Sequence, residues 1–141
     1  MITGININST RSFVSTRDPG KDNPTVFHIG ILDPFIRSWI DDRCTSLQIS
    51  QGGPDAQANA SIAPKKMSIL HVKYGVRAID NLIDPLTKMA VLIKMETVSV
   101  NGKAYQALPD EVLCLLGTNL IDELAAEIIK EQDLSEAAQK N

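Results

Sequence analysis

The sequence predicts an α+β domain, in which a small antiparallel sheet of hairpins packs against three to four helices, two of them at the C-terminus. Three observations carry this prediction. Asn101 and Gly102 lie between β-rich residues, and this pair accepts the positive φ values of a two-residue hairpin turn. Residues 120–131 repeat their apolar side chains at helical spacing. The length of 141 residues suits one domain, residues 1–141, with a single core.

The first predicted hairpin joins residues 11–16 to residues 25–32. The second of these segments is rich in β-branched and aromatic residues, which favours a strand. Between them, Asp18, Pro19 and Gly20 are typical turn residues, so we expect a long and exposed connection there.

Asp33 and Pro34 predict the start of the first helix, because an aspartate can cap free amides and proline at the first helical position loses no hydrogen bond. Trp39 falls at helical spacing with Ile36 and Ile40. Two roles remain open for its indole, packing against the sheet or anchoring a partner, and its place on the apolar side favours packing.

After a strand-like segment at residues 44–49, residues 51–64 predict a flexible loop or arm. This tract is rich in Ala, Asn, Gln and Ser, and it has too few apolar side chains to offset its ordering entropy. We expect it to be an excursion from the domain that contacts a neighbouring subunit. The candidate partner contacts of the whole chain are Trp39, Asp18, Pro19, Gly20, Gly52, Gly53, Pro54 and Ile62.

The middle of the chain predicts one helix and two further β segments. Residues 67–76 favour a helix that ends near Gly75, although a strand is also compatible with part of this segment. Residues 79–83 and 89–100 are β-rich, and the breaker Asp84-Pro85 separates them.

Two helices are predicted at the C-terminal end. Residues 108–111 begin the first with two acids in its first turn, and Gly117 ends it. Asn119, with Asp122 three residues later, resembles a capping box at the start of the second. The apolar face expected on this last helix consists of Leu120, Ile121, Leu124, Ala125, Ile128 and Ile129.

Composition and motifs disfavour several classes of function. The net charge of -3 disfavours a general nucleic-acid binder, since phosphate neutralisation needs a basic surface. No apolar run approaches a membrane span, and the N-terminal residues lack a signal-peptide pattern, so we expect no membrane partner. Cys44 and Cys114 are expected to be free structural thiols, Cys114 on an apolar helix face, with their mutual distance left open. His28 and His71 lack metal-ligand spacing. We therefore predict no catalytic residue, no cofactor and no metal.

Three stretches of the chain carry a family resemblance. They are residues 18–42, with Pro24-Thr25-Val26-Phe27 and Ile31-Leu32-Asp33; residues 74–84, with Tyr74-Gly75-Val76 and Asn81-Leu82-Ile83-Asp84; and residues 108–141, with Leu108-Pro109-Asp110-Glu111-Val112. Together they resemble small tailed-bacteriophage proteins that are commonly encoded among virion-morphogenesis genes, some of which are labelled tail assembly chaperones.

This resemblance implies a non-enzymatic virion structural or assembly protein of the neck, tail or capsid surface. Its expected partners are other phage structural proteins, namely capsid, portal or neck, and tail tube, while self-association is left open. The expected location is the virion, assembled in the host cytoplasm. The alternative is a tail assembly chaperone that binds the tape-measure or tube protein and is absent from the mature virion. A small binding or regulatory domain without a phage role is a third interpretation.

Overall fold

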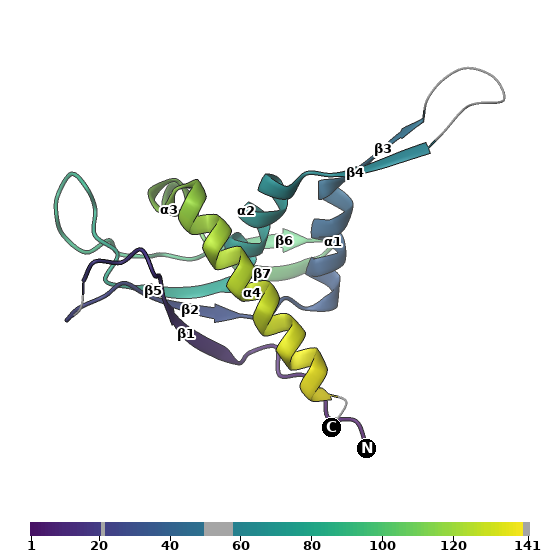
Figure 1. Ribbon diagram of the computed structural model, residues 1–141, viewed down its shortest axis with the longest axis horizontal. Helices are drawn as coiled ribbons and strands as arrows, with labels where there is room; N and C mark the ends of the chain where they lie inside the picture. Colours follow the sequence, from purple (N-terminus) through teal and green to yellow (C-terminus); the bar gives the residue numbers. More distant parts are fainter. Residues whose placement is uncertain (21, 50–57, 140–141) are drawn as a thin grey trace.

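The computed structural model describes residues 1–20, 22–49 and 58–139, and it confirms the α+β fold. Figure 1 shows helix α4 crossing one face of the sheet that contains β1, β2 and β5. The described strands are β1 (Thr10–Val14), β2 (Val26–Gly30), β3 (Thr45–Ile49), β4 (Ala58–Ile62), β5 (Val76–Asp80), β6 (Glu96–Val100) and β7 (Lys103–Ala107). The described helices are α1 (Pro34–Cys44), α2 (Pro64–Gly75), α3 (Asp110–Leu116) and α4 (Thr118–Gln139).

The main sheet is antiparallel, with the strand order β1-β2-β5. The predicted first hairpin is confirmed, since β1 pairs with β2 in the register that places Phe13 opposite Phe27. Strand β1 is also tied to α4 by charge, because Arg11 lies 2.8 Å from both Glu127 and Glu131. The first strand is therefore fixed to the helix that covers the sheet.

The second predicted hairpin is confirmed as well. Strands β6 and β7 pair in an antiparallel register that places Val100 opposite Lys103. Between them Asn101 has a φ of 50° and Gly102 a φ of 81°, and two consecutive positive φ values define a type I′ turn. The backbone preferences of Asn101 and Gly102 therefore determine the turn of this hairpin.

Helix α2 lies between two clusters of buried apolar side chains. Its Val72 belongs to the larger cluster, which joins β2, β5, α3 and α4, and its Tyr74 belongs to the smaller cluster, which joins α1 to the β6–β7 hairpin. Leu124 and Ile128 of α4 are fully buried in the larger cluster, as predicted, but Ile129 is 42% exposed. One helix therefore contributes to both cores through neighbouring residues.

The prediction of a loop over residues 51–64 is wrong over its second part. Strand β4 pairs antiparallel with β3, with Thr45 opposite Ile62, and Pro64 is already the first residue of α2. The Ala63 amide donates to the Cys44 carbonyl oxygen at 2.7 Å and closes the base of this two-stranded ribbon. The β3–β4 backbone pairing supplies order to this segment that the composition of residues 51–64 did not predict. Figure 1 shows the ribbon projecting from the body of the molecule.

Two smaller expectations also need correction. Cys114 is exposed, because α3 packs inward through Val112, Leu113 and Leu116, whereas Cys44 is buried at the end of α1. Helix α4 begins at Thr118, directly after Gly117, and not at Asn119.

Substituting Gly75 tests the packing of α2 against α4. A Cβ added at Gly75 would lie 2.7 Å from Ile128 Cδ1. Overpacking of this kind costs about 1–3 kcal/mol, which exceeds the gain in helix propensity of about 1 kcal/mol or less at the last residue of a helix. We expect Gly75→Ala to lower the free energy of unfolding in urea.

The matched control is Gly4→Ala, because a Cβ at Gly4 would have no heavy atom within 4 Å. Adding Ile128→Val to Gly75→Ala removes the contacting methyl group, so the pair should be less unstable than the two separate losses together. A Gly75→Ala variant as stable as the parent would contradict this close helix contact.

Candidate functional site

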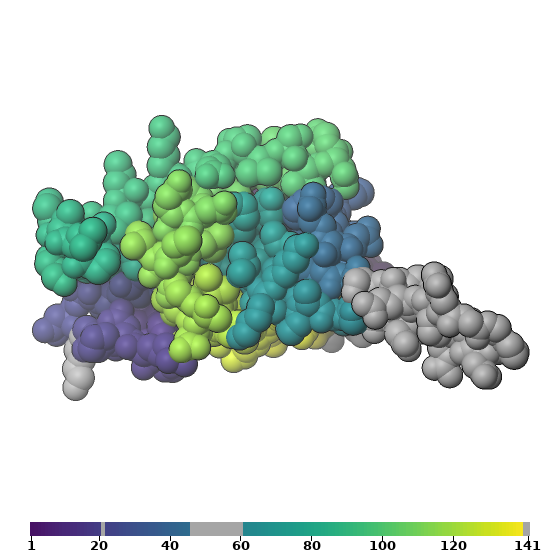
Figure 2. Space-filling view, turned by 90° about the horizontal axis from the view of Figure 1, so that it is seen from above, coloured from purple at the N-terminus to yellow at the C-terminus, as the bar shows by residue number. Residues whose placement is uncertain are grey.

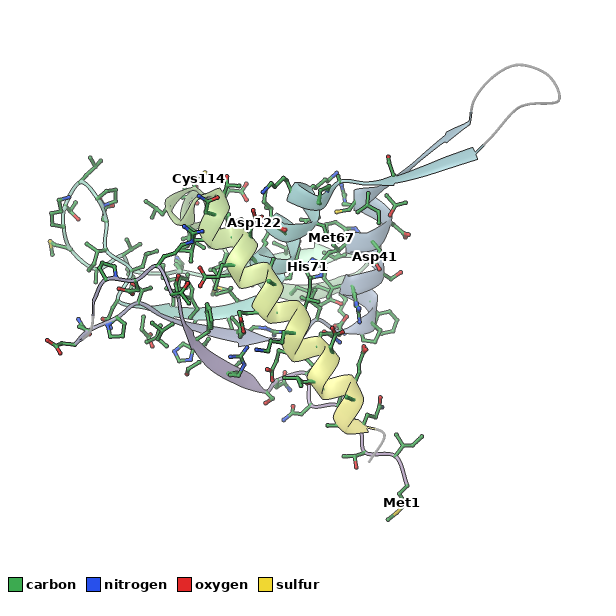
Figure 3. The ribbon with its side chains drawn as sticks, in the orientation of Figure 1. Met1, Asp41, Met67, His71, Cys114 and Asp122 are labelled. Carbon is green, nitrogen blue, oxygen red and sulfur yellow. The ribbon has the colours of Figure 1, made fainter. Side chains whose placement is uncertain are left out.

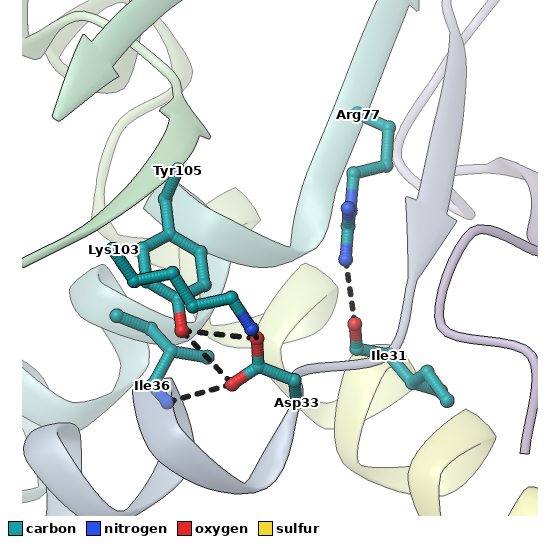
Figure 4. Close-up of polar contacts among 6 residues, drawn as sticks. All are labelled: Ile31, Asp33, Ile36, Arg77, Lys103 and Tyr105. Carbon is teal, nitrogen blue, oxygen red and sulfur yellow. Dashed lines mark hydrogen bonds and ion pairs between the residues drawn. The ribbon is translucent and has the colours of Figure 1, made fainter. Parts of the chain in front are cut away.

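A buried carboxylate, that of Asp33, is the centre of a polar cluster between α1 and the β6–β7 hairpin (Figure 4). Asp33, 7% exposed, caps α1 by accepting a hydrogen bond from the Ile36 amide at 2.9 Å. The same carboxylate accepts a bond from Lys103 Nζ at 2.8 Å. The Tyr105 hydroxyl donates to it as well, 2.9 Å from one oxygen and 3.0 Å from the other. Asp33 thereby links the start of α1 to strand β7.

The electrostatics of this cluster favour a structural role. Burial acts to raise the pKa of Asp33, but the hydrogen bonds from Lys103, Ile36 and Tyr105 outweigh it and hold that pKa below its ordinary value. The bond to Asp33 raises the pKa of Lys103, and burial together with the same carboxylate raises the pKa of Tyr105. All three groups keep one protonation state near neutral pH, whereas acid–base catalysis needs a pKa close to the working pH.

Arg77 of β5 lies beside this cluster. Its Nη2 donates to the Ile31 carbonyl oxygen at 2.6 Å, while its buried Nε has no partner. A Cβ at Gly30 would lie 2.9 Å from that Nε, so a larger residue there would force the Arg77 side chain to shift. Burial lowers the pKa of Arg77, yet arginine remains charged at neutral pH. This side chain braces the end of β2 just before Asp33.

The remaining chemistry-bearing side chains do not converge. Within residues 1–20, 22–49 and 58–139, no group of three or more His, Cys, Asp or Glu could hold a metal ion. His28 pairs with Asp80, and His71 bonds to the Met67 carbonyl oxygen one turn earlier in α2. Figure 3 shows Met67 and His71 together on α2, and Asp41, Cys114 and Asp122 on three other helices. In the same part of the chain, no helix is long and apolar enough to cross a membrane.

An apolar groove of about 710 Å³ lies where the β1–β2 connection meets the α3–α4 junction. The predicted turn residues Asp18, Pro19 and Gly20 line it together. Its apolar walls come from Phe27, Leu82, Ile83, Leu116 and Leu120. The structure therefore brings this one predicted group of contacts to a concave surface.

Hydrogen bonds hold the wall of the groove in place. The Asp18 carboxylate accepts from the Gly20 amide at 2.8 Å and from the Thr25 amide at 2.7 Å. The Thr25 hydroxyl donates to the Asn81 carbonyl oxygen at 2.9 Å, which joins the wall to the end of β5. The connection is long, as predicted, but its described residues are pinned at several points.

A projecting turn, which we call the apolar loop (residues 82–92), borders the groove. Its backbone closes on itself, because the Val91 amide donates to the Leu82 carbonyl oxygen at 2.7 Å and the Asp84 amide to that of Met89 at 2.9 Å. The Asp84 carboxylate accepts from the Leu86 amide at 2.7 Å. The breaker predicted at Asp84-Pro85 is confirmed, while the strand predicted over residues 89–100 covers only Glu96–Val100.

The apolar loop holds large side chains in solvent. Leu86 is 91% exposed, Leu92 92%, Met89 69% and Ile83 50%. Figures 1 and 2 show the loop at one end of the long axis, and Figure 2 shows side chains of this segment standing out from the surface. Ile83 also lines the groove, so loop and groove form one continuous apolar surface. We take this surface as the candidate functional site.

The other predicted contacts lie elsewhere. The Trp39 ring packs edge-on against Tyr74 of α2, with 5.9 Å between ring centroids, whereas the packing favoured from the sequence was against the sheet. Its side chain is half-buried, so a contact with a partner stays a prediction. Ile62, at the base of the ribbon, is 62% exposed. Gly52, Gly53 and Pro54 lie outside the described residues.

The apolar loop was absent from the predicted contacts, because its closely spaced apolar residues are equally typical of a strand. Comparisons of the chain with protein-family models, with curated proteins and with solved structures find no match.

Asp33→Asn tests the buried carboxylate through the pH dependence of stability. The pKa of Asp33 is lower in the folded chain than the ordinary value of about 3.9 expected in the unfolded chain. Its contribution to stability is therefore present above about pH 4 and is lost as the pH falls through the folded-state pKa. We expect Asp33→Asn to be less stable at pH 7 and to lose less stability than the parent between about pH 4 and pH 2.

Denaturant unfolding at a series of pH values measures both effects. The control is Asp41→Asn, which changes an exposed carboxylate on the same helix. An Asp33→Asn variant with the parent's pH profile would contradict the role assigned to this group.

Proposed function

We propose that this chain is a non-enzymatic bacteriophage structural or assembly protein that binds another phage structural protein through the apolar loop and the adjoining groove. One observation carries the proposal: an internally hydrogen-bonded turn holds Leu86, Met89 and Leu92 in solvent beside an apolar cavity. Exposed apolar side chains that cluster beside an apolar groove are typical of interaction sites in folded proteins. The resemblance to tailed-phage proteins supplies the class of partner, a component of the neck, tail or capsid surface.

The energetics favour a bound loop over a free one. Burial of a leucine or methionine side chain is worth roughly 1.5–3 kcal/mol. The backbone of the loop is already ordered by its own hydrogen bonds, so docking needs little further loss of conformational entropy. These terms support contact as the role of the loop.

The charged residues around the loop indicate which charges we expect on the surface of the partner. Lys88 and Lys94 are exposed beside the apolar side chains, whereas the Asp84 carboxylate is already bonded to the loop's own amides. Since interfaces have an apolar centre and a polar rim, we expect acidic residues around an apolar pocket on the partner.

A tail assembly chaperone is the alternative. The same exposed apolar side chains favour it, because they would bind a tape-measure or tube protein before that protein is assembled. Mass spectrometry of purified particles separates the two functions. Many copies of this chain per particle support the structural role, and its absence from particles supports the chaperone.

A double substitution in the loop tests the proposal. We expect Leu86→Ser with Leu92→Ser to fold with parental stability, within about 0.5 kcal/mol, since both side chains are exposed. The variant should fail to support particle assembly in the phage that encodes it, as measured by the yield of infectious particles.

Leu134→Ser is the matched control, because Leu134 is a 56% exposed leucine on α4, away from the loop. A normal particle yield with the loop variant would exclude the loop as the functional contact. Equal losses with both variants would show that the effect is not specific to the loop.

A further inference from the structure

Aromatic side chains gather at one cleft on the α1 side of the molecule. The chain has only three Phe, two Tyr and one Trp, yet Phe35, Trp39 and Tyr105 all line this cleft of about 510 Å³. Two of the rings come from α1 and the third from β7. Phe35 and Trp39 are four residues apart on the helix, so they lie on one face, and Phe35 is 72% exposed.

Two of the three rings of the cleft, those of Trp39 and Tyr105, are held in place by neighbouring side chains. Tyr74 lies between Trp39 and Tyr105, with ring centroids 5.9 Å and 6.1 Å away, in edge-to-face contacts. The Arg43 guanidinium lies 4.5 Å from the centroid of the Trp39 ring, and the Tyr105 hydroxyl is bonded to Asp33. These two rings can therefore bind a ligand with little further loss of side-chain entropy.

The polar groups of the cleft are hydrogen-bond donors. Lys103 Nζ lies 5.2 Å from the centroid of the Phe35 ring, and the ammonium has more donors than its one bond to Asp33 uses. The Trp39 indole N–H has no partner within the described part of the chain. Flat rings with donors beside them complement proline, which offers an apolar ring and a carbonyl acceptor and lacks an N–H.

An acidic depression of about 400 Å³ adjoins the cleft and shares Pro34, Ser38 and Asp42 with it. Its carboxylates come from Asp41, Asp42 and Glu136. Glu136 is paired with Arg37 at 3.0 Å, but Asp41 and Asp42 are exposed and make no ion pair within the described residues. A basic residue next to a bound proline would complement these charges.

We propose that the cleft of Phe35, Trp39 and Tyr105 binds an extended, proline-rich peptide segment whose neighbouring basic residue lies against Asp41 and Asp42. Grooves lined by aromatic side chains recurrently bind proline-rich peptides, which already adopt the polyproline II conformation before they bind. The site goes beyond the proposed function, because it uses a different surface from the apolar loop. It holds or fails independently of that loop.

Peptide binding to the full chain tests the proposal. The probe is a fluorescein-labelled, proline-rich peptide with one terminal arginine, and the control peptide has glycine at every proline position. Trp39 is the only tryptophan, so its emission reports binding at the cleft directly. We expect the proline peptide to raise the anisotropy and change the Trp39 emission, and the glycine peptide to do neither.

Three variants locate the binding. Phe35→Ala removes an exposed ring and should weaken binding by about tenfold or more without unfolding the chain. Asp42→Asn should weaken binding of the arginine peptide but not of a peptide that ends in glutamine. Leu134→Ala, an exposed position on α4, should leave the affinity unchanged.

Several results would overturn the proposal. They are no change in Trp39 emission with the proline peptide, equal affinity for the glycine peptide, and equal affinity of Phe35→Ala and the parent. A change in Trp39 emission caused by an oligosaccharide mixture and not by the peptide would assign the cleft to another class of ligand.

Discussion

The carboxylate of Asp33 is the constraint on which the α1 side of the molecule depends. Asp33 lies in the short connection between β2 and α1. Its carboxylate accepts hydrogen bonds from a helix amide, a lysine and a tyrosine. A buried charge is tolerated only with such partners. Because the donors come from α1 and β7, one group sets both the start of the helix and the distance to the β6–β7 hairpin. Lys103 and Tyr105, which bond to Asp33, also line the aromatic cleft, so the Asp33 carboxylate helps to determine the shape of that cleft.

The two cores are coupled through α2. Val72 and Tyr74 lie two residues apart but face different clusters, and Gly75 lets the end of the helix approach Ile128 of α4. A projecting element is connected to each end of α2. The β3–β4 ribbon leads into the start of α2, and β5 leads from its end into the apolar loop. Both projecting elements are thus attached to the same helix.

Local signals predicted much of this fold, and long-range geometry accounts for what they missed. Asn101-Gly102 and Asp33-Pro34 act within a few residues, so their turn and helix start were readable. Strand β4 has little β propensity of its own and is ordered by pairing with β3. The cleft could not be predicted, because Asp33 and Tyr105 are 72 residues apart and no spacing rule connects α1 to β7. The apolar loop was missed for a different reason: the spacing of apolar residues in a sequence does not show whether their side chains are buried or exposed.

The contrast between the two cysteines makes the native chain convenient for spectroscopy. Cys44 is buried and Cys114 is exposed on α3, so a thiol-directed dye would couple selectively to α3. The lone indole, on α1, can serve as the energy donor to that dye. Energy transfer from Trp39 to a dye on Cys114 would therefore report changes in the distance between α1 and α3, with no substitution in the chain.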